Sequence, residues 1–250
     1  MSGRDLDLAR TLLDPGLFSD NTEAMTAFYT GTVGLAFLER LPHSETYAEV
    51  FFTLPPGKLK IQSSTLPMDA ADSGYVELMV ARANQASVES VTDPDGLPVH
   101  LVPLGYRGVT TAGYVVAVAD VDVQKQFYVN AMGAVDTGDG LRVGDTMLFL
   151  RHDPAKHRAT PPWRRGFTHI TLIVHDALAA HEALLVAGAE HSLRLLRLAD
   201  RCLFSWVRDP HGNWIELVQY AELSGPLPDI DRLHDCWDAV TRWREDGVSF

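Results

Sequence analysis

The sequence predicts an α+β fold built from repeated modules, each with a strand, a helix and further strands. Two observations predict it. Short runs of strand-forming residues recur along the chain, and stretches with helical spacing of apolar residues lie between some of them. Because this order returns with a period of about 50–60 residues, we expect a repeat architecture.

The expected strands are short runs of β-type residues. They are Ala9–Leu13, Glu49–Thr53, Lys58–Gln62, Tyr75–Val80, Pro98–Val102, Tyr114–Ala119, Thr146–Arg151, His169–Val174, Cys202–Val207 and Trp214–Gln219. Three helices are expected, because acidic or Asn caps precede apolar residues at helical spacing. They cover Asn21–Gly31, Val121–Met132 and Ala177–Ala187.

Two sequence signatures occur twice. Asp209-Pro210-His211-Gly212 aligns without gaps on Asp93-Pro94-Asp95-Gly96, and each turn leads into an expected strand. The first two helices each carry a Phe-Tyr pair behind an acidic cap, and a glycine follows each pair. The repeats therefore align as modules.

These repeats resemble the vicinal oxygen chelate superfamily, which includes glyoxalase I, bleomycin-resistance proteins and extradiol dioxygenases. The resemblance covers about residues 8–220 in four modules, which begin near Leu8, Gly74, Gly113 and Phe167. It implies βαβββ modules that pair into two cupped mixed sheets and hold a divalent metal. The scaffold hosts many chemistries, so the resemblance indicates the fold more strongly than the reaction.

We expect two domains and a C-terminal helix. Residues 1–110 would hold the first two modules, 111–225 the last two, and 226–250 an amphipathic helix. The second module is expected to be truncated, without its helix and one strand, because the interval from Glu77 to His100 is about half the corresponding interval in the fourth module. The helix, over Asp229–Arg244, would dock on the back of a sheet or between two copies of the chain, as in a homodimer.

The composition restricts the partners. The 250 residues are 46% hydrophobic and carry a net charge of −12, which is the wrong sign for a protein that binds nucleic acid or an anionic membrane. No apolar run is long enough to span a bilayer, and the N-terminus does not resemble a signal peptide, so we expect a cytoplasmic protein with a small organic substrate or ligand. Cys202 and Cys236 are expected to be reduced.

The resemblance implies metal ligands on the first and last strands of paired modules. His169 and Glu216 occupy these positions in the fourth module, and an imidazole with a carboxylate suits Fe, Mn, Zn or Ni. In the third module, Gly113 stands at the first-strand position and supplies no ligand, so this cup is expected to have an open side there. The alternative is that His169 hydrogen-bonds within the barrel and Glu216 is a half-exposed strand residue.

A rival metal set lies in the N-terminal half. Asp14, Glu77 and His100 fall on the matched positions of the first two modules and are expected to converge, with Gln62 as a fourth donor. Each also has an ordinary interpretation: Asp14 as a turn former, Glu77 as a solvent-facing strand residue and His100 as a packed imidazole.

Two functions remain open. The first is an enzyme of the glyoxalase or dioxygenase type, a lyase, isomerase or dioxygenase in which a divalent metal chelates neighbouring substrate oxygens, with Glu216 or Glu77 as the general base. The alternative is a metal-free binding or drug-resistance protein of the bleomycin-resistance type, in which aromatic residues stack on a flat ligand. Tight binding of one transition-metal equivalent separates the two.

Overall fold

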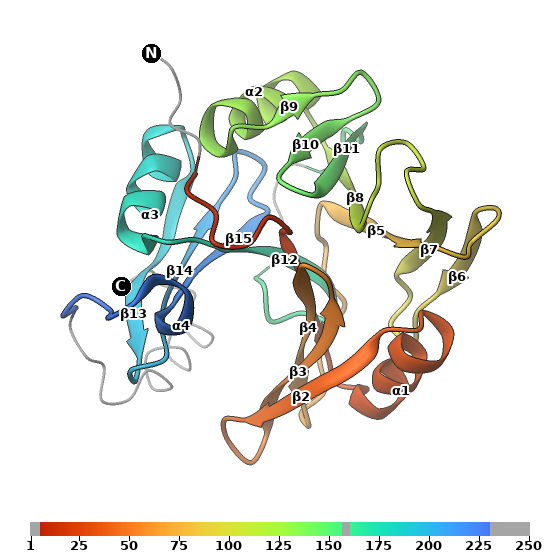
Figure 1. Ribbon diagram of the computed structural model, residues 1–250, viewed down its shortest axis with the longest axis horizontal. Coiled ribbons are helices and arrows are strands. Elements are labelled where there is room, and N and C mark those ends of the chain that lie inside the picture. The colour runs from red at the N-terminus through yellow and green to blue at the C-terminus, as the bar shows by residue number, and fades with distance from the viewer. Residues whose placement is uncertain (1–5, 157–160, 231–250) are drawn as a thin grey trace.

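The structure is a computed structural model that describes residues 6–156 and 161–230. Its larger sheet has eight strands in the order β13-β14-β15-β12-β1-β4-β3-β2 (Figure 1). The strands are β1 (Asp14–Ser19), β2 (Ala36–Pro42), β3 (Tyr47–Leu54), β4 (Gly57–Ser64), β12 (Gly166–Ile173), β13 (Glu190–Leu198), β14 (Cys202–Arg208) and β15 (Trp214–Tyr220). This sheet therefore combines the first and fourth modules.

The second sheet has seven strands in the order β6-β7-β5-β8-β11-β10-β9 and combines the second and third modules. The strands are β5 (Tyr75–Arg82), β6 (Glu89–Thr92), β7 (Pro98–Pro103), β8 (Ala112–Val118), β9 (Val135–Asp136), β10 (Leu141–Val143) and β11 (Thr146–His152). Both sheets contain parallel and antiparallel pairs, which confirms the expected mixed sheets.

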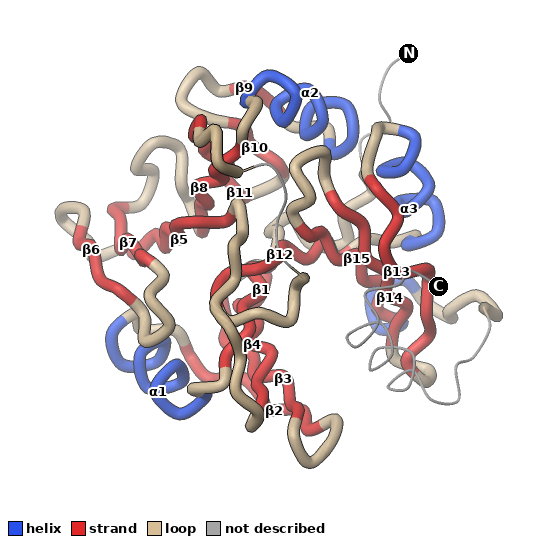
Figure 2. Tube along the Cα trace, turned by 180° about the vertical axis from the view of Figure 1, so that it is seen from behind, coloured by secondary structure: helices blue, strands red, loops and turns tan. Residues whose placement is uncertain are grey.

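The helices pack on the sheets at the outside of the molecule, as the view from behind shows (Figure 2). They are α1 (Thr22–Ala27), which continues as the π-helical turn η1 (Phe28–Thr32), α2 (Val121–Met132), α3 (Ala177–Val186) and the short α4 (Ala221–Ser224). Two of the three expected caps are confirmed: the side chain of Asp120 accepts hydrogen bonds from two backbone N–H groups at the start of α2, and that of Asp176 from one in α3. At α1 the N-cap residue Asn21 makes no side-chain hydrogen bond to the helix.

The prediction that each cup combines consecutive modules is wrong. The first strand of the chain, β1, pairs antiparallel with β12, and β5 pairs antiparallel with β8, so each sheet crosses the boundary expected at residues 110/111. Gly113 lies on β8 opposite Met79, away from the sheet that carries His169 and Glu216, and the expectation that it opens a side of their site is also wrong. The first strand of each module has a similar free edge. The repeat alone therefore does not determine which two modules pair through these edges.

The predicted truncation of the second module is confirmed, because β5, β6 and β7 follow one another without a helix. The strand expected at Ala9–Leu13 is wrong in position, since β1 begins at Asp14 and includes Pro15 and Gly16. Sequence patterns also missed β2, β9, β10 and β13. The helix expected at Asp229–Arg244 lies almost wholly outside the described residues, as does Cys236.

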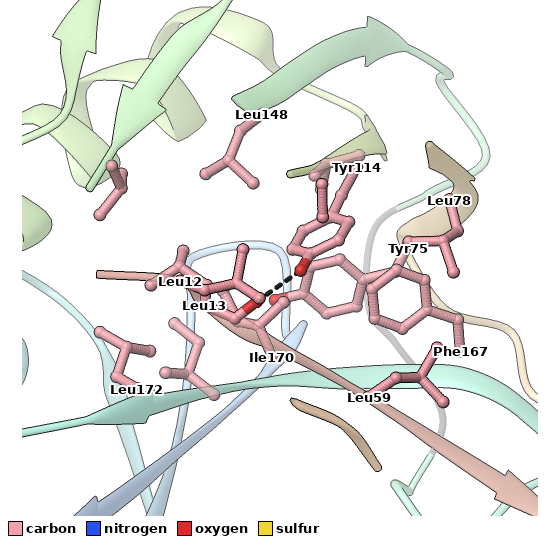
Figure 3. Packing of buried hydrophobic residues seen from close by; sticks show 14 of the residues in the cluster. Leu12, Leu13, Leu59, Tyr75, Leu78, Tyr114, Leu148, Phe167, Ile170 and Leu172 are labelled. Atoms are coloured by element: carbon pink, nitrogen blue, oxygen red, sulfur yellow. Dashed lines mark hydrogen bonds between the residues drawn. The ribbon is translucent and has the colours of Figure 1, made fainter. Parts of the chain in front are cut away.

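The hydrophobic core lies between the two sheets, where Tyr75, Tyr114 and Phe167 pack together (Figure 3). Successive strand residues point to opposite faces. On β4, Leu59 and Ile61 therefore enter this core while Lys60 points away from it. Among the described residues, no helix is long and apolar enough to cross a membrane.

Candidate functional site

The candidate site lies on the face of the eight-stranded sheet that points away from the shared core. A pocket there has an empty volume of about 930 Å³, open solvent included; we call it the cup pocket. Aromatic side chains line much of it, namely Phe18, Tyr47, Phe51, Trp163, Phe204, Trp206 and Tyr220. Polar side chains line the rest, namely Asp14, His43, Glu49, Lys60, Gln62, Thr171 and Glu216.

The strand register matches four positions of the first and fourth modules. On β4, Lys60 pairs with Gly16 of β1, and on β15, Glu216 pairs with Thr171 of β12. Asp14 and His169 precede those two partners by two residues on their strands, and so face the same side. Lys60 is therefore the first-module counterpart of Glu216, as Asp14 is of His169.

Lys60 and Glu216 form a buried ion pair at the centre of this arrangement. The Lys60 ammonium donates a hydrogen bond to Oε2 of Glu216, and Thr171 Oγ1 donates a second to the same atom over 2.7 Å. Oε1 of Glu49 lies 3.9 Å from the ammonium nitrogen. Burial alone would lower the pKa of Lys60, but the carboxylates of Glu216 and Glu49 outweigh it and the pKa is raised, so the residue stays charged.

Glu49 is ionised as well. Burial acts to raise its pKa, but a hydrogen bond from His43, 2.9 Å from Oε2, and the charge of Lys60 lower it below the ordinary value. The ammonium of Lys60 is thus close to two carboxylates.

His169 is fully buried beside this pair. Its Nδ1 lies 3.0 Å from the hydroxyl of Thr168, and its Nε2 lies 3.8 Å from Oε2 of Glu216 without a hydrogen-bond partner among the described residues. Burial, helped by the charge of Lys60, lowers the pKa of the imidazole well below its usual value. The ring is therefore neutral at physiological pH.

Asp14 is the fourth matched residue. Burial raises its pKa to about 7, although its Oδ1 accepts a hydrogen bond of 2.9 Å from the backbone N–H of Lys58. The carboxyl group lines the pocket, where it can gain or lose a proton near neutral pH.

The residues do not fit a resident divalent metal. The unpartnered Nε2 of His169 and its distance from Glu216 would suit two ligands of one ion, but the Lys60 ammonium already binds the same carboxylate oxygen. A dication about 4 Å from an ammonium is repelled by about 8 kcal/mol at an effective dielectric constant of about 20. Among the residues that the structure describes, no three His, Cys, Asp or Glu side chains are placed to share a metal ion.

The N-terminal set does not converge. Glu77 and His100 meet on the seven-stranded sheet, where Nε2 of His100 lies 3.0 Å from Oε2 of Glu77, and Arg151 donates to the other oxygen of this carboxylate. Asp14 lies on the other sheet, so the expectation that these three residues converge is wrong. The cause is the pairing of modules, which separates the first module from the second.

Sequence reasoning missed Lys60 and Glu49. The available signal was a lysine between two core residues, Leu59 and Ile61. The same strand was already expected to contribute a metal ligand, because it is the last strand of its module. The hypothesis that Gln62 is the last-strand donor selected the correct face of β4 but the wrong residue. The register places Lys60, not Gln62, opposite Gly16.

Comparison with known proteins agrees with this fold. Residues 110–217 match the family model of the Glyoxalase/Bleomycin resistance protein/Dioxygenase superfamily. The match covers the third module and most of the fourth, and the arrangement of the modules in the structure agrees with it. No curated protein sequence matches the chain.

Two solved structures are similar over most of the chain. Glyoxalase I from Zea mays has a TM-score of 0.65 at 16% identity, with 84% of this chain and 92% of that chain covered. A protein from Bacillus subtilis that is proposed to be a dioxygenase has a TM-score of 0.67 at 13% identity, with 98% and 97% covered. At these identities the similarity establishes the fold, and the superfamily itself contains both small-molecule enzymes and binding proteins.

Proposed function

We propose that the chain binds a small organic molecule with a flat aromatic part in the cup pocket, without a metal ion between protein and ligand. The observation that carries this proposal is the combination of aromatic walls with the buried Lys60–Glu216 pair. Aromatic side chains stack on flat ligands, and a few polar groups fix their orientation. This is the binding-protein alternative rather than the metal-dependent enzyme.

The charges of the pocket favour a neutral or cationic ligand. Three carboxyl groups line it, those of Asp14, Glu49 and Glu216. They are joined by the ammonium of Lys60 and the imidazole of His43. A carboxylate on the ligand would meet this negative group unfavourably, whereas an amine or hydroxyl could donate to Glu49. Aromatic rings around a cation add further stabilisation.

Calorimetry tests the proposal with pairs of aromatic amines and aromatic carboxylates of equal size, each measured with and without chelator. We expect the amines to bind more tightly, with no effect of chelator. Trp163→Ala, in the pocket wall, should weaken binding, whereas Phe37→Ala, on β2 outside the pocket and 50% exposed, should not. Affinity that is lost with chelator contradicts the proposal.

A second candidate function is a metal-independent enzyme in which Asp14 exchanges a proton with the bound molecule. It is favoured by the pKa of about 7, since a catalytic acid–base group works best with a pKa near the working pH. Asp14→Asn would then keep ligand affinity and lose turnover. Glu77, on the other sheet, has no part in either proposal.

The cytoplasmic location and the homodimer also stay predictions. Cell fractionation tests the first, and light scattering on the purified full chain tests the second.

A further inference from the structure

The counterpart of Glu216 in the first module is a cation. The register that pairs Gly16 with Lys60 repeats the one that pairs Thr171 with Glu216. In a two-module cup with pseudo-twofold symmetry, a carboxylate on one last strand predicts a second ligand on the other. This chain instead presents an ammonium there, and it directs that ammonium at the carboxylate.

The contacts around the ammonium are those that a cation needs. Lys60 Nζ binds Oε2 of Glu216 and has Glu49 Oε1 at 3.9 Å. Nε2 of His169, fully buried and without a hydrogen-bond partner among the described residues, lies 3.8 Å from the same Oε2. Without Lys60, Nε2 of His169 and Oε2 of Glu216 would be left 3.8 Å apart as two donors of types that Zn²⁺ takes, with no third His, Cys, Asp or Glu placed to share the ion among the described residues.

We infer that the Lys60 ammonium is the resident cation of this pocket, where it neutralises Glu216 and keeps divalent metals out. The side chain is covalently held, so the pocket carries its positive charge at every metal concentration. The inference rests on the proposed function only in treating the cup pocket as the binding site. Its test uses no organic ligand, so it can fail or succeed independently.

The test is Zn²⁺ binding by the full chain, measured by calorimetry after removal of metals with chelator. Lys60→Met should gain a Zn²⁺ site that the wild type lacks, because the obstructing charge is gone and two donors are freed, and Lys60→His, which adds a third donor, should bind Zn²⁺ more tightly still. Comparison with the wild type subtracts sites formed by other parts of the chain. Added Zn²⁺ should also raise the Tm of Lys60→Met more than that of the wild type.

Three further variants are controls. Lys58→Met removes another lysine of the same strand, one that forms an ion pair with Glu39. This variant should bind Zn²⁺ like the wild type. Lys60→Arg keeps the charge and should gain no site. The double variant Lys60→Met/Glu216→Gln should lose the gained site, because the carboxylate is missing.

Lys60→Met removes the counter-charge of Glu216, which keeps only the hydrogen bond from Thr171, and the variant could unfold without metal. Lys60→His supplies a ligand in place of the charge, and both variants can be refolded with Zn²⁺ present. The inference is overturned if neither variant takes up the additional Zn²⁺ under either condition. It is equally overturned if the wild type itself binds one Zn²⁺ tightly and loses it in Glu216→Gln.

Discussion

The imidazole ring of His169 lies over Gly16, its register partner on the neighbouring strand. A Cβ atom built on Gly16 would be 2.0 Å from Nε2 and 2.1 Å from Cε1 of that ring. Phe18 and Trp206 pack against the same imidazole, with ring centroids 5.9 and 4.6 Å away. The position of His169 beside Glu216 therefore depends on the missing side chain of Gly16.

Gly16→Ala should destabilise the protein, since the new methyl group must displace a ring that is enclosed by aromatic neighbours. Overpacking of this kind costs about 1–3 kcal/mol of the free energy of unfolding, measurable by urea denaturation. Gly31→Ala is the matched control, because no atom lies within 4 Å of a Cβ there. Equal stability of the two variants would contradict the packing described.

Asp14→Asn should change how stability depends on pH. Because the pKa of Asp14 is about 7 in the folded protein, against its ordinary value of 3.8, its contribution is greatest below the unfolded pKa and is lost as the pH rises through about 7. Asparagine does not titrate. The variant should gain up to about 4 kcal/mol relative to the wild type between about pH 4 and about pH 8, measured by urea unfolding at each pH.

Asp20→Asn is the control of opposite sign. Burial acts to raise the pKa of Asp20, but the backbone N–H of Met68 and the charge of Arg165 lower it overall. Its ionised form therefore stabilises the fold, and this variant should lose stability relative to the wild type as the pH rises. Parallel pH profiles for the two variants would refute the assignment of Asp14.

Tyr114→Phe should weaken the contact between the two sheets. The fully buried Tyr114 hydroxyl, from β8, donates a hydrogen bond to the backbone carbonyl of Leu13 just before β1 (Figure 3). Its loss leaves that buried carbonyl short of a partner, and we expect a cost of about 1–3 kcal/mol in urea denaturation. Tyr106→Phe, at a tyrosine that is 38% exposed, should have little effect.

Cys202 should be unreactive in the folded protein. Burial, helped by the charges of Glu49 and Glu216, raises the pKa of its thiol to about 12. At about pH 8 very little thiolate is present, and the thiolate is the reactive form. In a Cys236→Ser background, a thiol reagent should label Cys202 only after denaturant is added. Rapid labelling of the native protein would show that the thiol is not buried as described.

Much of the fold could be predicted from the sequence, because turn and cap signals are local. The two Asp-Pro-x-Gly turns and the caps at Asp120 and Asp176 aligned the modules and their helices. The pairing of β1 with β12 depends on contacts between distant segments, which no local pattern records. Pro15 indicated a turn, but it lies in β1, an inner strand between β12 and β4, and Gly16 beside it leaves space for the ring of His169.

The site was predicted in part. His169 and Glu216 lie together because matched positions on first and last strands face the same side, and Asp14 joins them through the unexpected pairing of modules. Glu77 and His100 also lie at matched positions on a first and a last strand, and they contact each other on the other sheet. Lys60 could not be assigned, because residue type alone does not separate a buried lysine from a solvated one, and only the register places it opposite Glu216.

The nested pairing of the modules sets an order for folding. The seven-stranded sheet is made from one contiguous stretch, residues 75–152, so it can form as soon as that stretch leaves the ribosome. The eight-stranded sheet joins residues as far apart as Lys60 and Glu216, 156 positions along the chain, and must close last. Until then the edge of β1 is unpaired, which makes it the place where a newly made chain is most open to aggregation or to exchange of strands with another copy.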